Sequence, residues 1–175
     1  GPTVYKHQHI GNYRTYILED ILQKTLEYDG YKVKRVLNIT DVGHLTSDAD
    51  TGEDKIEREA KKEKKSVRDI TNFYTNAFLK DLERLNIKKP EIIVKASETI
   101  DDQIKIIRKL FEKGFAYETP QAVYFNVSKF KNYGKLSGQS LSQKITAARD
   151  EVVEDKDKKN PADFALWFKR VGKFK

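Results

Sequence analysis

The residues best suited to chemistry lie near the start of the chain. A short β-branched and aromatic run, Thr3 to Tyr5, is followed by His9, Gly11 and Asn12, where a helical pattern begins. Strand-to-helix turns of this kind bind nucleotides, because the N–H groups at the helix start attract phosphate. Gly11 leaves room for a nucleotide, and His9 and Asn12 can donate hydrogen bonds to phosphate oxygens. The same residues also fit an ordinary surface histidine beside a helix start, so the alternative stays open.

The elements that must hold these residues follow a strand, helix, strand order. Apolar residues at helical spacing predict a helix that ends at Gly30, with one face made of Leu18, Ile21, Leu22, Thr25 and Leu26. The segment from Tyr31 to Thr40 predicts a second strand. Such spacing implies a parallel pair of strands joined by a right-handed crossover.

The rest of the chain predicts a third parallel strand and then a change of architecture. We expect a loop after Val42, then a solvated Lys/Glu-rich helix or arm up to Lys65, and then a helix capped by Ser66 and Asp69. A strand at Ile92 to Val94 follows, and after it a helix that is capped by Thr99 and ends at Gly114. The last part is expected to hold a hairpin of 116–117 with 122–127, a polar tail over 139–159 and a final apolar cluster at Phe164 to Phe168. The predicted fold class is therefore α/β. Residues 1–114 are predicted to form a nucleotide-binding domain and residues 115–175 an insertion that bears a β-hairpin.

Composition narrows the function classes. The chain has 175 residues, a net charge of +7, and neither cysteine nor methionine. Disulfides and thiolate metal sites are thus excluded within it, and it contains no apolar stretch long enough to span a membrane. We expect a cytoplasmic protein, a monomer. The Gly1-Pro2 start leads us to expect that this is part of a longer gene product.

Six separated motifs resemble the cysteinyl-tRNA synthetases, which are class I enzymes. The motifs occur in that family's order: Gly1-Pro2-Thr3-Val4-Tyr5 with His9-Ile10-Gly11-Asn12, then Gly30-Tyr31-Lys32-Val33 with Asn38-Ile39-Thr40-Asp41-Val42, Gly114-Phe115-Ala116-Tyr117, Val123-Tyr124-Phe125, Tyr133-Gly134-Lys135-Leu136-Ser137 and Asp163-Phe164-Ala165-Leu166-Trp167. Asn12 stands where the family's His-Ile-Gly-His signature has its second histidine. The resemblance implies the N-terminal half of a Rossmann-like (HUP-type) catalytic fold.

The resemblance also implies an activity and roles for particular residues. The family joins cysteine to ATP, with Mg²⁺, and passes the cysteinyl group to tRNA(Cys). By analogy, His9 and Asn12 would act on the ATP phosphates, and Thr3, Tyr5 and Gly11 would complete the ATP site. Thr40 and Asp41 would contact cysteine, and Tyr5 is a further candidate there.

The family's zinc site is expected outside this chain. Zinc selects cysteine over serine through the substrate thiolate. One zinc ligand of the family is a cysteine immediately before the position of Gly1, and the remaining ligands and the Lys-Met-Ser-Lys-Ser loop lie beyond Lys175. No metal ligand is therefore expected within this chain, and we expect the 175 residues alone to be inactive in aminoacylation.

Two other functions and two other surfaces stay open. A related ligase joins cysteine to an amino sugar, and a non-catalytic module could retain the fold to bind a nucleotide or RNA. The lysines within residues 61–65, or those within residues 129–135, could contact tRNA phosphates. Alternatively, the lysines of the first group could form a solvated face. Aromatic side chains of the insertion could stack on single-stranded tRNA ends or form the hairpin core: Tyr124, Phe125, Phe130 and Tyr133.

Overall fold

The computed structural model describes residues 1–43, 55–138 and 156–169, in two compact units. Unit 1 holds the described residues up to Thr99, and unit 2 holds those from Ile100 onward. This division lies one helix before the boundary at residue 114 that the sequence predicts. The predicted loop over 44–54 and most of the predicted polar tail lie outside the described residues. None of the described helices is long and apolar enough to cross a membrane.

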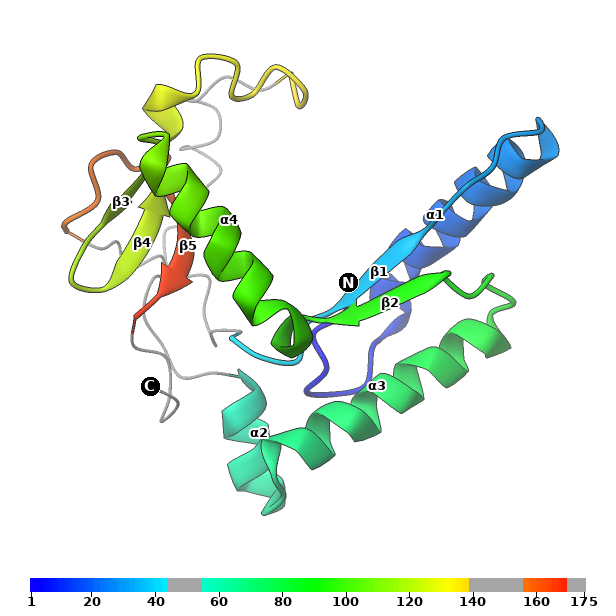
Figure 1. The fold of residues 1–175 in the computed structure, drawn as a ribbon. Helices are drawn as coiled ribbons and strands as arrows, with labels where there is room; N and C mark the ends of the chain where they lie inside the picture. Colours follow the sequence, from blue (N-terminus) through cyan, green and yellow to red (C-terminus); the bar gives the residue numbers. More distant parts are fainter. Residues whose placement is uncertain (44–54, 139–155, 170–175) are drawn as a thin grey trace. The chain divides into compact units, whose positions relative to one another are not determined.

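Unit 1 contains a pair of parallel strands and three α-helices (Figure 1). The elements are α1 (Ile10–Tyr28), β1 (Val36–Ile39), α2 (Lys55–Glu63), α3 (Val67–Arg84), β2 (Ile92–Lys95) and the 3₁₀ turn η1 (Ala96–Thr99). Strand β1 pairs in parallel with β2, from Val36 opposite Ile92 to Ile39 opposite Lys95. The predicted first strand is reduced to one parallel bridge, in which Thr3 lies opposite Thr40.

The core of unit 1 forms on one face of this strand pair. Side chains alternate along a strand, so Leu37 and Ile39 of β1 share one face, and both are buried. Helices α1 and α3 pack there through their aromatic side chains. The ring of Phe78 is stacked on that of Tyr13, with centroids 5.9 Å apart. The members of the core come from the Thr3 segment, α1, one face of β1, α3 and the loop after α3: Val4, Tyr13, Tyr16, Leu37, Ile39, Phe78, Leu82 and Ile87.

The prediction that the apolar face of α1 packs into the core is wrong. Leu18, Ile21 and Leu22 are 67%, 56% and 58% exposed. The buried side chains of this helix are instead Tyr13, Tyr16, Asp20 and Gln23. Asp20 can be buried because its carboxylate accepts the backbone N–H of Lys88 at 2.8 Å and pairs with Lys24 at 2.6 Å. Helical periodicity does not reveal such a distant partner, and it therefore selects the wrong side of the helix.

The Lys/Glu-rich segment forms helix α2, with a small apolar contact of its own. The sequence predicts a solvated helix or arm there, but Ile56 and Ala60 are buried and pack with Ile70 of α3. Two apolar residues four apart are enough to bury one side of a short helix. The predicted cap of α3 is confirmed, since the Ser66 hydroxyl accepts the backbone N–H of Asp69 at 3.1 Å.

Unit 2 contains α4 (Ile100–Glu112) and a three-stranded antiparallel sheet. The sheet has the order β3 (Ala116–Glu118), β4 (Ala122–Phe125), β5 (Phe164–Phe168), and the 3₁₀ turn η2 (Val127–Lys129) follows β4. The predicted hairpin is confirmed as β3 and β4, and the predicted last apolar cluster is the third strand. Trp167 lies in β5 opposite Val123.

Helix α4 differs from its prediction at both its cap and its face. Thr99 belongs to η1, where its hydroxyl donates to the carbonyl of Ala96 at 3.2 Å. No residue of α4 is buried, although its apolar residues recur at helical spacing. Its end is as predicted: Gly114 has a φ of +74°, and the N–H of Phe115 donates to the carbonyl of Leu110.

Candidate nucleotide pocket

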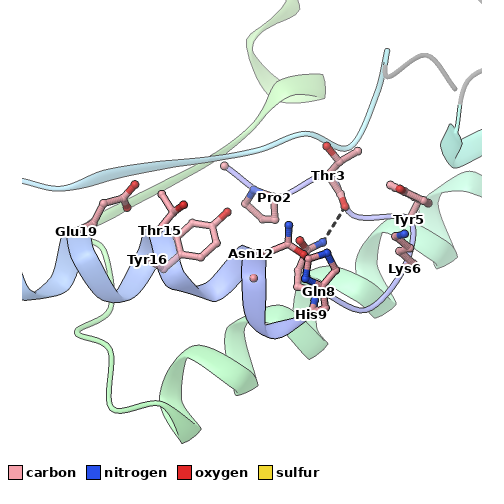
Figure 2. Close-up of a pocket in the computed structure, with 12 residues that line it drawn as sticks. Pro2, Thr3, Tyr5, Lys6, Gln8, His9, Asn12, Thr15, Tyr16 and Glu19 are labelled. Atoms are coloured by element: carbon pink, nitrogen blue, oxygen red, sulfur yellow. Dashed lines mark hydrogen bonds between the residues drawn. The ribbon is translucent and has the colours of Figure 1, made fainter. Parts of the chain in front are cut away.

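A pocket of about 440 Å³ lies between the Thr3 segment and the first three turns of α1 (Figure 2). Two groups of side chains line it. The first group comes from the segment before the helix and comprises Gly1, Pro2, Thr3, Tyr5, Lys6, Gln8 and His9; the second comes from α1 and comprises Gly11, Asn12, Thr15, Tyr16 and Glu19. All five ATP-site residues predicted from the sequence, namely Thr3, Tyr5, His9, Gly11 and Asn12, are therefore brought together in this pocket.

The backbone at Thr3 and Thr40 holds one wall of the pocket. The N–H of Val4 donates to the carbonyl of Thr40, and the N–H of Thr40 donates to the carbonyl of Pro2, at 3.2 and 2.9 Å. The side chain of Gln8 then reaches back and donates from Nε2 to the carbonyl of Thr3 at 3.1 Å. These bonds fix the turn that leads from the bridge to the helix.

His9 is the N-cap residue of α1 and has an extended backbone, with φ −102° and ψ 168°. The N–H groups of the next two residues have no carbonyl one turn earlier to bond, so they stay available to a ligand. A side chain at Gly11 would interfere here: an ideal Cβ would lie 3.0 Å from Nδ1 and Cε1 of the His9 ring. Glycine thus lets the imidazole lie against the start of the helix.

Asn12 contacts the backbone of His9 through one end of its amide. Its Oδ1 accepts the His9 N–H at 3.1 Å, an arrangement that caps the helix. Because the oxygen is used in this bond, the Nδ2 group is the remaining donor of the side chain. The amide therefore both stabilises the helix start and presents N–H groups at the pocket.

Sequence reasoning missed several lining residues, among them Lys6, Gln8, Thr15, Tyr16 and Glu19. A signal for the last three was present, since Asn12, Thr15, Tyr16 and Glu19 follow the spacing of one helical face. Burial, together with the carboxylate of Glu19, raises the pKa of Tyr16 to about 12. The Tyr16 phenol consequently keeps its proton at neutral pH.

The two residues assigned to cysteine, Thr40 and Asp41, do not line this pocket in the part of the chain that the structure describes. Asp41 is buried after the end of β1, and both its oxygens are engaged by Ser97 of η1. Its Oδ1 accepts the Ser97 N–H at 2.9 Å, and its Oδ2 accepts the Ser97 hydroxyl at 2.6 Å. These contacts connect the segments that follow β1 and β2.

Comparison with known proteins gives one family and a consistent set of relatives. A family model described as "tRNA synthetases class I (C) catalytic domain" matches residues 1–173. The chain is 49% identical over 168 residues to the cysteine–tRNA ligase of Treponema denticola, covering 96% of the chain and 34% of that protein. It is 45% identical over 173 residues to the corresponding ligase of Chlorobaculum tepidum, covering 97% and 35% of the two chains. The chain spans about a third of the length of these curated relatives.

Proposed function

The chain belongs to the family of class I (C) tRNA synthetase catalytic domains, and from this membership we propose that the protein activates cysteine with ATP and transfers the cysteinyl group to tRNA(Cys). The named relatives act as cysteine–tRNA ligases, which favours tRNA over an amino sugar as the acceptor. The α/β fold class and the family resemblance predicted from the sequence are both confirmed by this membership. We propose that the protein works in the cytoplasm as a monomer.

The pocket at the start of α1 is the observation that carries this proposal. It lies where a strand segment passes into a helix, the position at which nucleotides bind to sheets of this class. The positive end of the helix dipole and the first N–H groups favour bound phosphate. The His9 imidazole and the Nδ2 group of Asn12 supply two side-chain donors at the same end.

The chemistry needs positioning and charge stabilisation rather than a strong base. An oxygen of the cysteine carboxylate forms a bond to the α-phosphorus of ATP, and the bond from that phosphorus to the pyrophosphate oxygen breaks. Negative charge then grows on the phosphate oxygens, where His9 and Asn12 can donate hydrogen bonds. In the second step a ribose hydroxyl of tRNA attacks the cysteinyl carbonyl and AMP leaves.

The described residues of the chain contain no cluster of metal ligands. Mg²⁺ and Zn²⁺ belong to the expectations raised by the family resemblance. Among the described residues, however, no group of three or more His, Cys, Asp or Glu side chains could hold a metal ion. No step of the proposed reaction is therefore assigned to a metal held by these residues.

Asp41 is proposed as a positioning residue for the cysteine site, with Thr40 as the candidate contact. Each oxygen of the Asp41 carboxylate accepts a hydrogen bond from Ser97, so we propose that Asp41 influences a substrate through the placement of the segment after β1. Thr40 is half-buried and anchored by its backbone to the Thr3 segment.

ATP binding to the chain tests the proposal directly. Titration of ¹⁵N-labelled protein with ATP should shift the amide signals of His9 to Asn12, and His9→Ala should weaken the binding. If ATP shifts no signal in this segment, the chain does not bind the nucleotide here. Pyrophosphate exchange by the full-length protein, followed by charging of tRNA or of an amino sugar, identifies the acceptor.

A further inference from the structure

We propose that Lys6 binds the β- and γ-phosphates of ATP and thereby sets the direction in which the nucleotide lies along the pocket at the start of α1. The ligand is the polyphosphate end of a nucleoside triphosphate, and the group that binds it is the ammonium of Lys6. This inference rests on the proposed function, because it assigns a further residue to the ATP site.

The charged side chains of the pocket lie at its two ends. Among the described residues that line it, Lys6 is the one lysine or arginine and Glu19 is the one carboxylate. Figure 2 shows these two side chains at opposite ends of the lining group, with His9 and Asn12 between them. Glu19 also comes nine residues after Ile10, about 13 Å along the helix axis from the start of α1. A polyanion is therefore attracted to the Lys6 end of the pocket and repelled from the Glu19 end.

The start of α1 adds charge of the same sign at the same end. The partial positive charge of a helix N-terminus falls off within the first turn, so it acts near His9 and not near Glu19. Lys6 stands three residues before His9 in the segment that leads into the helix. The α-phosphate can thus lie at the helix start while the β- and γ-phosphates extend towards Lys6.

The loop that carries Lys6 is anchored on both sides. Before it, the N–H of Val4 donates to the carbonyl of Thr40 at 3.2 Å. After it, Nε2 of Gln8 donates to the carbonyl of Thr3 at 3.1 Å. These two bonds fix the backbone from which the Lys6 side chain extends, so its ammonium has a limited range of positions at the pocket.

The ammonium of Lys6 is oriented and still available to a ligand. It lies 5.4 Å from the centre of the Tyr5 ring, a cation–π contact with a neighbouring lining residue. The side chain is exposed, and within the described ranges no carboxylate pairs with it. Lys24 differs, because Asp20 holds its ammonium at 2.6 Å. Lys6 therefore keeps N–H donors and a full charge for phosphate oxygens.

Lys6 would act on the leaving group of the proposed reaction. As the bond between the α-phosphorus and the pyrophosphate oxygen breaks, negative charge grows on the pyrophosphate. A cation beside the β- and γ-phosphates stabilises this charge, in addition to the donors of His9 and Asn12 at the helix start. AMP lacks these two phosphates, so Lys6 should contribute to the binding of ATP and not to that of AMP.

Calorimetric titration of the full chain with ATP and with AMP tests this role. Lys6→Gln should weaken ATP binding about 5- to 50-fold, because a charge-assisted contact is lost, and should change AMP binding less than about 2-fold. Lys6→Arg should retain most of the ATP affinity, because the charge is kept. The ratio of the two affinities is the quantity that a merely structural role of Lys6 would not change.

Lys34→Gln provides the matched control. This substitution removes the same charge from an exposed position of unit 1 that does not line the pocket. Both affinities should therefore stay within about 2-fold of those of the unsubstituted chain. Circular dichroism of each variant checks that the fold is retained.

Three results would overturn the inference: unchanged ATP affinity in Lys6→Gln, equal losses of ATP and AMP affinity in that variant, or an equal effect of Lys34→Gln. The amide shifts of His9 to Asn12 with ATP are read separately on the unsubstituted chain. If ATP shifts these signals and Lys6→Gln binds ATP normally, the proposed function stands and the role of Lys6 fails. If ATP shifts none of them, both fail.

Discussion

The side-chain Oδ1 of Asn12 accepts a hydrogen bond from the backbone N–H of His9 over 3.1 Å. This bond fixes which end of the amide faces the pocket, because the oxygen is already occupied. The amide caps the helix, and in the proposed site its Nδ2 group would also donate to the nucleotide, in the position where the family has its second signature histidine. The two tasks can be separated by substitution.

Asn12→Asp separates the helix cap from the pocket donor. A carboxylate oxygen can still accept the His9 N–H and suits the positive end of the helix, so thermal stability should stay the same or rise slightly. The donor group is lost and a negative charge is added, so ATP affinity should fall about 10- to 100-fold. Calorimetric titration with ATP beside a melting curve measures both. An unchanged affinity would show that Nδ2 does not contact the nucleotide, and Asn12→His should retain binding.

Gly11→Ala should reduce ATP affinity without reducing stability. The added Cβ would lie 3.0 Å from the His9 ring, which can move because it is exposed, while alanine favours the helix by about 1 kcal/mol or less. Gly30→Ala makes a control with the opposite profile. At Gly30, φ is +87°, so alanine should cost about 1 kcal/mol or more in unfolding free energy and leave ATP binding intact. A Gly11 variant that binds ATP normally would contradict the role given to His9.

A substitution on the exposed face of α1 and one in the core of unit 1 should change the free energy of unfolding by very different amounts. Leu22→Ala on the exposed face of α1 should change the unfolding free energy by about 0.5 kcal/mol or less. Phe78→Ala in the core should cost about 3–5 kcal/mol, because it leaves a cavity among Tyr13, Tyr16 and Leu82. Urea unfolding followed by far-ultraviolet circular dichroism compares them. A large loss with Leu22→Ala would mean that this side of α1 is covered in solution.

The acid dependence of stability should show the contribution of Asp20. Burial raises the pKa of this carboxyl, but the stronger combined effect of the hydrogen bonds from Lys24 and the Lys88 N–H, and of nearby positive charge, holds it below its usual value. The stabilisation is therefore present above the unfolded pKa and is lost as the pH falls through the folded one. Asp20→Asn should cost about 1–3 kcal/mol at pH 7. The difference from the unsubstituted chain should shrink below about pH 4.

Glu91→Gln gives the matched control for that experiment. Glu91 is exposed and the substitution is of the same chemical kind, so its effect on the unfolding free energy should be within about 0.5 kcal/mol at either pH. A difference between Asp20→Asn and the unsubstituted chain that stayed constant down to pH 2 would contradict the assignment to ionisation.

Local sequence signals predicted the elements of this fold well. The helix cap at Ser66, the glycine stops at Gly30 and Gly114, and the hairpin of β3 and β4 all depend on residues close together in the chain. The parallel strand at Ile92 was also predicted, because its apolar run stands between two helical patterns. Family membership confirms the α/β class.

Contacts between residues far apart in the chain could not be predicted from these local signals. The burial of Asp20 depends on a backbone N–H 68 positions later, and the engagement of Asp41 depends on Ser97, 56 positions later. The apolar residues of α1 mark a different side of the helix, so they do not predict the pocket residue Glu19, which shares a face with Asn12. The roles given to His9, Gly11, Asn12, Thr3, Tyr5, Thr40 and Asp41 stay predictions for the experiments above.

Trp167 in β5 is the sole tryptophan of the 175 residues, and it belongs to unit 2. Its fluorescence should report the unfolding of the antiparallel sheet and not that of the nucleotide pocket. Circular dichroism at helical wavelengths, by contrast, is dominated by α1 and α3 of unit 1, which are longer than α4. Tryptophan fluorescence and circular dichroism therefore report on different units of one chain. If both signals change in the same transition, the two units unfold cooperatively.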